Sequence, residues 1–230
     1  MSAAVVIENL PKQSYTLKES LRGIRTNIQF SGDNVKVILI TSVTPDEGKS
    51  SVSFDLARSF ADNGKRVLFV DTDIRKSVHI TRMAVKTTDG SAIKGLTHYL
   101  SGQSPIDDVM YSTNVPNLYT IFAGPTSPNV TELLDKKYFS NLIKGARSHF
   151  DYVIVDTAPI TVTIDASLIA KECDGAVLVM VPGENKTNVI RRCIKQLKAS
   201  NIDILGVILN KFEVSKNSYY GKYYGHEGKK

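Results

Sequence analysis

Apolar residues in this chain of 230 residues form short continuous runs, which alternate with longer stretches of helical period. The runs are rich in valine, isoleucine and leucine, as in strands that are buried on both faces of a sheet. Between the runs, apolar residues recur every three or four positions, as on one face of a helix. The alternation predicts an α/β fold, a mostly parallel sheet with helices on both faces. The predicted strands are residues 35–41, 66–71, 118–122, 151–156, 175–181 and 204–209.

Helical periodicity is clear near the N-terminus, where four aliphatic residues from Leu17 to Ile28 fall on one face of a helix that begins at Thr16. Residues 1–15 carry little periodicity, so we expect an N-terminal arm there. The stretch 76–116 is rich in residues typical of loops and should contain one short helix. The other predicted helices are residues 52–60, 96–100, 131–134, 138–150 and 187–198.

A polar loop follows the first predicted strand and ends in Gly48-Lys49-Ser50, directly before a helix. This strand–loop–helix context is what a phosphate-binding loop requires, and it predicts a P-loop NTPase fold. Lys49 would bridge the outer phosphates and Ser50 would hold Mg²⁺, although Val43 stands where the first glycine of the usual pattern belongs. The residues predicted to bind ATP in this loop are Pro45, Asp46, Glu47, Gly48, Lys49, Ser50 and Ser51.

Aspartates end two further predicted strands. Asp71 and Asp73 are two positions apart after the second strand, so an extended chain points both carboxylates the same way. Asp156 ends the strand at 151–156 and is the carboxylate expected beside the Mg²⁺ of a P-loop site. Ligands of open parallel sheets bind beyond the carboxyl ends of the strands, so these groups should face the nucleotide. The predicted metal site therefore comprises Ser50, Asp71, Asp73 and Asp156.

Two further polar residues near these strand ends have two interpretations each. Arg75 either stabilises negative charge on the transferring phosphoryl group or forms a structural ion pair. Asn210 either contacts the adenine edge of the nucleotide or simply terminates the last strand. We include Arg75 with Lys49, Asp71 and Asp73 among the candidate catalytic residues, and Asn210 among the candidate ATP-binding residues.

Composition narrows the class of protein only modestly. A hydrophobic content of 42% is that of an ordinary globular protein, and no apolar run is long enough to cross a bilayer. The net charge of +6 suits an anionic ligand or an anionic membrane surface, and we expect no nucleic-acid partner. Cys173 and Cys193 indicate free thiols in a reducing cytosol, while His79 and His98, without partners at metal-ligand spacing, are interpreted as structural.

The C-terminal residues 213–230 contain glycine, lysine and a tyrosine cluster but no apolar periodicity, so a disordered, tyrosine-rich tail is expected. The tail leaves the last strand at the same edge of the sheet as Lys49 and Asp156. The predicted organisation is therefore the arm, a nucleotide-binding domain over residues 16–212, and the tail. The clustered tyrosines are Tyr219, Tyr220, Tyr223 and Tyr224.

Together these motifs resemble those of bacterial tyrosine autokinases of the capsular or exopolysaccharide type, in particular the separate cytosolic kinase subunit of Gram-positive bacteria. The segment from Ser42 to Ser50 is similar to that family's proline-containing Walker A motif. Val70–Arg75 resembles its additional Asp-x-Asp motif, and Val153–Pro159 resembles its Walker B motif. The resemblance extends from the Glu-x-x-Arg-x-x-Arg pattern of the first helix to the tyrosine cluster.

The resemblance implies a Mg·ATP-dependent kinase that phosphorylates its own tail tyrosines between the subunits of a homo-oligomeric ring. Asp71 would be the base that receives the tyrosine proton. A membrane-bound activator subunit that controls polysaccharide chain length would hold the cytoplasmic kinase at the inner face of the membrane. The kinase would in turn regulate capsule or exopolysaccharide synthesis and export, with a cognate tyrosine phosphatase as a further partner. By resemblance the ring contact is formed by Glu19, Arg22 and Arg25, although their spacing alone favours a solvated helix face.

Two other classes of protein remain open on the residues alone. One is an ATPase switch of the kind that positions partition or division machinery; those proteins carry a lysine near the start of the loop, where this chain has Val43. The other is an adaptor that senses a nucleotide without catalysis. Phosphotyrosine on the chain would distinguish the kinase from both.

Overall fold

The structure, a computed structural model, describes residues 4–212 of the chain. Within this range nine strands form a single sheet in the order β4-β1-β5-β6-β3-β7-β2-β8-β9. Six neighbouring strands, β6, β3, β7, β2, β8 and β9, are parallel to one another. Strand β5 runs antiparallel to β6, and β1 runs antiparallel to β4. The strands are β1 (Ala4–Ile7), β2 (Val37–Ser42), β3 (Val67–Asp71), β4 (Val85–Thr87), β5 (Tyr111–Thr113), β6 (Leu118–Ile121), β7 (Tyr152–Asp156), β8 (Gly175–Met180) and β9 (Asp203–Leu209).

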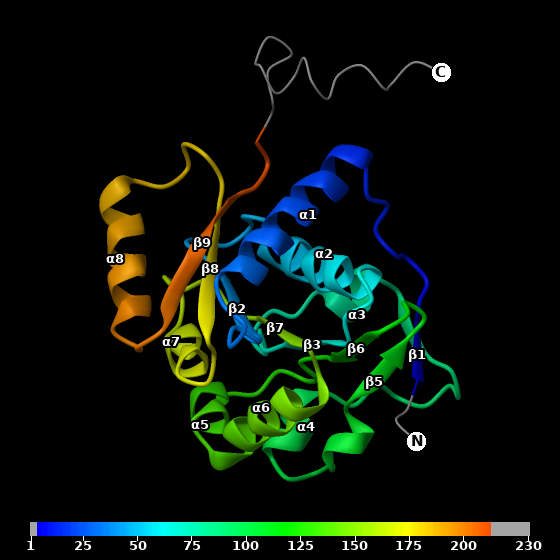
Figure 1. The fold of residues 1–230 in the computed structure, drawn as a ribbon. Coiled ribbons are helices and arrows are strands. Elements are labelled where there is room, and N and C mark those ends of the chain that lie inside the picture. The colour runs from blue at the N-terminus through cyan, green and yellow to red at the C-terminus, as the bar shows by residue number, and fades with distance from the viewer. Residues whose placement is uncertain (1–3, 213–230) are drawn as a thin grey trace, which may run out of the picture.

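Helices cover both faces of this sheet, as the alternating pattern predicted (Figure 1). Helices α1 and α2 pack on one face, and α4 to α8 pack on the other. Among residues 4–212, no helix combines the length and the apolar character that crossing a bilayer requires. The helices are α1 (Tyr15–Phe30), α2 (Lys49–Asp62), α3 (His79–Arg82), α4 (Leu96–Leu100), the 3₁₀ turn η1 (Ile106–Asp108), α5 (Val130–Leu134), α6 (Lys137–His149), α7 (Asp165–Ala170) and α8 (Thr187–Lys198).

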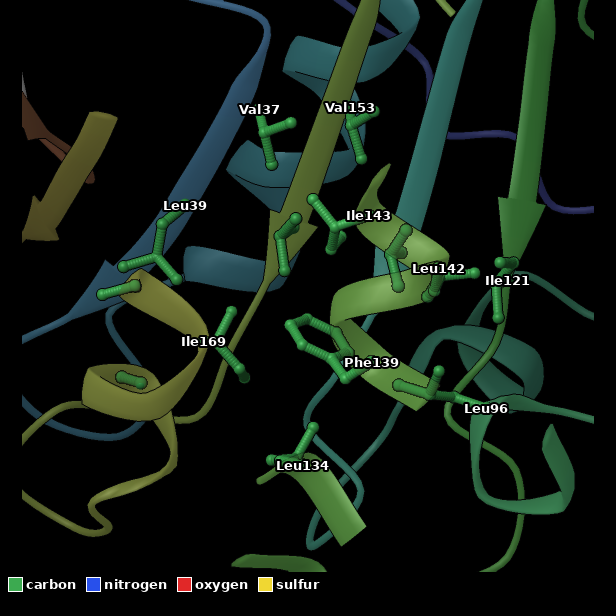
Figure 2. Close-up of a cluster of buried hydrophobic side chains, with 14 of the residues drawn as sticks. Val37, Leu39, Leu96, Ile121, Leu134, Phe139, Leu142, Ile143, Val153 and Ile169 are labelled. Carbon is green, nitrogen blue, oxygen red and sulfur yellow. The ribbon is translucent and has the colours of Figure 1, made fainter. Parts of the chain in front are cut away.

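The central strands are buried on both faces because they supply a different set of side chains to each side. In β2, Val37 and Leu39 belong to one hydrophobic cluster, and Ile38 and Ile40 belong to the other. Figure 2 shows the first cluster, in which Phe139 on α6 points toward Ile169 of α7 and Ile143 lies near Val153 of β7. All six residues of β2 are buried, which explains why this segment lacks the alternation of a half-exposed strand.

Two predictions about the N-terminal half need correction. The expected arm over residues 1–15 contains β1, which pairs with β4 and β5 in the central sheet. The stretch 76–116 contains β4, β5, α3 and the 3₁₀ turn η1 as well as the single helix that was predicted, at 96–100. These strands have only three or four residues, and pairing with distant segments supplies hydrogen bonds that local periodicity does not reveal.

Candidate active site

The loop between β2 and α2 brings the chain round to the N-terminus of α2. Gly48, which precedes the helix, has a φ of 80°, and Asp46 has a φ of 63°. Both values lie in the left-handed region, which glycine adopts without steric cost. Val43, at the position where a glycine is usual, is fully buried in the core. Its side chain therefore stays out of the site, and the loop closes on α2 without that glycine.

The buried side chain of Glu47 stabilises this loop through hydrogen bonds. Its carboxylate is fully buried and accepts hydrogen bonds from the backbone N–H of Thr44 at 2.8 Å and of Val181 at 3.2 Å. The amide of Asn185 donates a further bond at 2.6 Å. Glu47 was predicted to bind ATP; its carboxylate is committed to the protein, so the backbone is the part of Glu47 left for a ligand.

Residues that follow β9 hold the same loop from another side. The Asn210 amide donates to the carbonyl oxygen of Glu47 at 2.8 Å, and Lys211 Nζ donates to that of Asp46 at 2.7 Å. An added Cβ on Gly48 would lie 2.2 Å from the Asn210 nitrogen. Asn210 therefore leaves room only for glycine at position 48. If Asn210 contacts adenine as predicted, it must do so while its amide keeps the hydrogen bond to Glu47.

The loop forms one wall of a cavity of about 540 Å³, which is in the range that small-molecule ligands occupy. Lys49, Ser50 and Ser51 line the cavity from the start of α2. Asp73 and Arg75 line it from the chain that follows β3. The structure thus brings the predicted phosphate-binding loop and Asp73 of the Asp-x-Asp motif to one cavity, while Asp71 is fully buried and does not line it.

Asp71 and Asp156 lie beside this loop because β3 and β7 are neighbouring strands, in which these two residues are directly opposite each other. Both carboxylates are fully buried. Lys49 Nζ donates to Asp156 Oδ1 at 2.7 Å and to the Ser50 hydroxyl at 3.1 Å. His79 Nε2 lies 3.0 Å from Asp156 Oδ2. Two positive or polar groups therefore converge on one carboxylate.

The pKa values of these groups diverge. Burial raises the pKa of Asp71 to about 6, and the nearby charge of Asp156 adds to the effect of burial. Burial opposes the ionised form of Asp156 too, but Lys49 and His79 outweigh it and hold its pKa below the usual range. For Asp73, burial raises the pKa although Lys49 acts in the opposite direction. Burial disfavours a charged His79, but Asp71 and Asp156 outweigh burial and raise the pKa of His79.

The donor atoms at this edge of the sheet fit a hard divalent cation. Asp71, His79 and Asp156 each offer a ligand atom, and these atoms lie within 4.8 Å of one another. The Ser50 hydroxyl lies beside Lys49, next to the same carboxylates. Carboxylate and hydroxyl oxygens, completed by water and phosphate, are the ligands that Mg²⁺ prefers. Of the predicted metal residues, Asp71 and Asp156 therefore lie close together, and a shared metal site with Ser50 and Asp73 stays a prediction.

For Arg75, the structure supports the interpretation as an ion pair. Its guanidinium donates to Asp165 Oδ2 at 2.8 Å and to the Thr131 hydroxyl at 3.1 Å. Asp165 is 2% exposed, whereas the Arg75 side chain is 39% exposed and still lines the cavity. This pair links the chain after β3 to α5 and α7. A contact of Arg75 with the transferring group stays a prediction.

Three residues at the site were not predicted from the sequence. His79 was interpreted as structural, yet it contacts Asp156. Arg82 donates to the Ser51 hydroxyl at 2.6 Å and lines the cavity. Asp165 anchors Arg75. None of them lies in a recognisable local motif, so their roles follow only from the chain's path after β3. His98, also interpreted as structural, accepts a hydrogen bond from the backbone N–H of Gly95.

The residues predicted at a ring contact lie on α1. Arg22 pairs with Glu19 at 2.8 Å, and the Arg22 side chain is 63% exposed. Arg25 instead contacts α2, where its guanidinium donates to the backbone carbonyl of Ser59 at 2.7 Å and to the Ser59 hydroxyl at 3.2 Å. The three predicted residues therefore divide into a surface ion pair, with Arg22 exposed and Glu19 half-buried, and a residue that joins two helices of the same chain.

The predicted phosphorylation sites Tyr219, Tyr220, Tyr223 and Tyr224 lie outside the described residues.

Known proteins resemble this chain over nearly its whole length. A family model described as an AAA domain matches residues 35–200. The tyrosine-protein kinase CpsD of Streptococcus agalactiae is 41% identical over 225 residues, which are 97% of this chain and 96% of the relative. The kinase domain of the Escherichia coli tyrosine kinase ETK has a TM-score of 0.78 and 30% identity, and the match covers 88% of this chain and 80% of that one. The chimerical protein CapA2B2 has a TM-score of 0.79 and 32% identity, over 88% of this chain and 87% of the chimera.

These matches confirm the predicted P-loop fold. They also confirm the resemblance to bacterial tyrosine kinases that the motifs at the strand ends indicated. They also decide between the alternatives, because the relatives that match nearly the whole chain are protein-tyrosine kinases. The chain accordingly binds a nucleotide and is a kinase. It belongs to the family of bacterial tyrosine-protein kinases.

Proposed function

We propose that this kinase binds Mg·ATP at the carboxyl ends of β2, β3 and β7 and phosphorylates the tyrosines of its own C-terminal tail. The observation that carries the proposal is the contact between the residues that follow β9 and the phosphate-binding loop. Asn210 and Lys211 contact the phosphate-binding loop, and Phe212 is the next residue. Phe212 and Tyr219 are seven residues apart, so an extended chain spans roughly 25 Å between them. The tail therefore starts beside the site that activates the phosphoryl group.

In the proposed reaction the bond between the γ-phosphorus and the β,γ-bridging oxygen breaks, and a bond from that phosphorus to the tyrosine oxygen forms. ADP leaves with the electron pair of the broken bond, and the phenolic proton passes to Asp71. Such a transfer depends on positioning and on neutralisation of charge more than on covalent chemistry. Asp71 suits the role of proton acceptor because its pKa of about 6 leaves it ionised at neutral pH yet more basic than an exposed aspartate.

The remaining residues would bind and orient the nucleotide. Lys49 would turn from Asp156 to the β- and γ-phosphates, and Ser51 would contact the α-phosphate with Arg82 behind it. Ser50 would hold Mg²⁺ directly, while Asp73 and Asp156 would hold the water molecules around it. Mg²⁺ would supply charge neutralisation at the phosphate oxygens.

We further propose that the kinase acts together with a membrane-bound activator subunit, in a homo-oligomeric ring, to regulate capsular or exopolysaccharide synthesis and export. The resemblance to capsular kinases supports this assignment, as does the solved chimerical protein CapA2B2. On the same ground we propose that the activator holds the kinase at the inner face of the membrane and that a tyrosine phosphatase is a further partner.

Mass spectrometry of the intact purified chain after incubation with Mg·ATP tests the proposal. The wild-type chain should gain up to four phosphoryl groups, and Lys49→Met should gain none while keeping its fold. Changing Tyr219, Tyr220, Tyr223 and Tyr224 together to phenylalanine should also prevent labelling. Lys144→Met is a matched control, because Lys144 is exposed on α6 away from the cavity, and it should behave as the wild type. Release of free phosphate without phosphotyrosine would contradict the proposal, as would labelling that survives the tyrosine changes.

A further inference from the structure

His79 is a buried polar side chain that the proposed reaction does not use. It is the first residue of α3 and is 3% exposed. Its ring packs against two aromatic rings, with its centroid 4.9 Å from that of Phe69 and 6.3 Å from that of Phe54. An apolar side chain would fill this place without leaving a polar group to satisfy. The presence of an imidazole here therefore requires an explanation beyond packing.

The explanation lies in its contact with Asp156. His79 Nε2 is 3.0 Å from Asp156 Oδ2, and an ionised carboxylate only accepts hydrogen bonds, so Nε2 carries the hydrogen. The other oxygen, Oδ1, accepts from Lys49 Nζ at 2.7 Å. Each carboxylate oxygen thus has its own donor, and the two donors come from different elements, α3 and α2. This arrangement fixes the plane of the carboxylate.

Nucleotide binding would disturb one of these two donors and leave the other in place. In the proposed function Lys49 turns to the phosphates, which removes its hydrogen bond from Asp156. Asp156 is fully buried, and a buried carboxylate that loses its partner is strongly disfavoured. His79 cannot follow the nucleotide, because Phe54 and Phe69 enclose its ring. It remains as the donor that keeps Asp156 oriented after Lys49 has moved.

We propose that His79 is a positioning residue: it holds Asp156 Oδ2 so that Oδ1, released by Lys49, faces the water molecules around the nucleotide's Mg²⁺. This inference rests on the proposed metal site. Donors behind a metal-binding carboxylate commonly change metal affinity by about 10–100-fold when they are removed. His79 would accordingly tune how strongly Mg²⁺ and the nucleotide reinforce each other, without touching either.

The test measures binding rather than catalysis. The affinity of a fluorescent ADP analogue, mant-ADP, is determined with excess Mg²⁺ and again with EDTA, and the ratio of the two affinities gives the enhancement by Mg²⁺. For His79→Leu the enhancement should fall about tenfold or more, while the affinity in EDTA stays within about twofold of the wild type. His79→Gln restores an N–H donor and should recover most of the enhancement. His149→Leu, a change at an exposed histidine of α6, should leave both affinities unchanged.

Several results would overturn the proposal. If His79→Leu keeps the wild-type enhancement, His79 does not position Asp156. If its affinity falls equally with Mg²⁺ and with EDTA, His79 supports the pocket as a whole. A direct metal ligand is a third outcome: nitrogen favours Mn²⁺ over Mg²⁺, so a selective loss of Mn²⁺ enhancement in His79→Gln would replace positioning by ligation.

The failure of the metal site itself is distinguishable, because the wild-type chain would then show no enhancement by Mg²⁺, and this inference would fall with the site. Should His79→Leu not fold, His79→Phe, which retains an aromatic ring against Phe69, takes its place in the comparison.

Discussion

Asp71 and Asp156 are the same residue type in the same degree of burial, yet their pKa values shift in opposite directions. The difference lies in their partners. Asp156 receives hydrogen bonds from Lys49 and His79, which favour its ionised form. Asp71 receives its bonds from neutral donors, the Ser77 hydroxyl and a backbone N–H. Groups whose environments separate their pKa values can take different roles, and in the proposed reaction these are a fixed charge for Asp156 and a proton acceptor for Asp71.

A pH dependence follows from this difference. Asp71 accepts a proton only when it is ionised, and its pKa of about 6 means that it becomes protonated as the pH falls below 6. We therefore expect kcat/KM for tail phosphorylation, which reports on the free enzyme, to fall about tenfold per pH unit below 6. Initial rates of phosphotyrosine formation at subsaturating ATP, between pH 5 and 8, measure this profile. A rate that stays level down to pH 5 would exclude Asp71 as the base.

Residue roles were predictable from the sequence only where a local pattern carries them. Gly48-Lys49-Ser50 and the aspartates after the strands form such patterns. The structure brings the loop and Asp73 to one cavity, and it places Asp71 opposite Asp156 on neighbouring strands. The buried carboxylate of Glu47 was not predictable in this way, because two of its partners, Val181 and Asn185, follow β8, far along the chain. The same holds for Asp165, whose pairing with Arg75 depends on where α7 packs.

At the scale of elements, the turn from β2 into α2 depends on one glycine. Gly48 combines a positive φ with a close neighbour, since a Cβ at this position would lie 2.2 Å from the Asn210 amide nitrogen. Gly64, beyond the other end of α2, has a similar φ of 77° but open space around it. The two glycines flank the same helix. A substitution at Gly64 therefore introduces backbone strain alone, whereas one at Gly48 adds a steric clash to that strain.

Gly48→Ala should therefore weaken nucleotide binding far more than Gly64→Ala does. Each change places alanine in a left-handed conformation, which costs about 1–2 kcal/mol. Only Gly48→Ala also pushes Asn210 off the loop, so we expect at least about a tenfold loss of mant-ADP affinity there. Gly64→Ala should lower the melting temperature but keep the affinity within about twofold. Equal affinities in the two variants would show that Asn210 does not need the glycine.

The long strands and helices were predictable because each carries its own pattern. The run from Val37 to Ser42 is apolar or buried throughout, and α8 presents a regular apolar stripe. Strands β1, β4 and β5 were missed because three or four residues are too few to show a period. Their stability comes from pairing across the sheet, which joins segments more than 100 residues apart in the chain, such as Ala4 and Ser112.

At the scale of the whole molecule, the order of the strands creates the site. Three motifs that are far apart in the sequence follow β2, β3 and β7, which are adjacent strands in the sheet. Parallel strands end at a common edge, so their terminal side chains converge there. This convergence was predictable from the fold class. The position of α3, which carries His79 and Arg82 to the same edge, was not, because it depends on the irregular chain between β3 and β4.

The surface of α1 offers a test of assembly that does not depend on catalysis. The proposed homo-oligomeric ring and the surface ion pair Glu19–Arg22 favour a contact between subunits at α1. Arg22→Ala should shift the mass of the wild-type oligomer toward that of the monomer, measured by light scattering. It should leave the melting temperature nearly unchanged, because an exposed ion pair is worth about 0–1 kcal/mol within one chain.

Two controls separate assembly from stability. Arg25→Ala removes hydrogen bonds that join α1 to α2, so it should cost about 1–3 kcal/mol of unfolding free energy and lower the melting temperature. Lys86→Ala breaks the exposed ion pair between Lys86 of β4 and Glu8, which follows β1. This change should alter neither the mass nor the melting temperature. If Arg22→Ala retains the wild-type mass, or if the wild type is itself a monomer, α1 does not form the predicted contact. A loss of assembly in Arg22→Ala with an unchanged melting temperature assigns the surface ion pair to the neighbouring subunit and Arg25 to the chain's own fold.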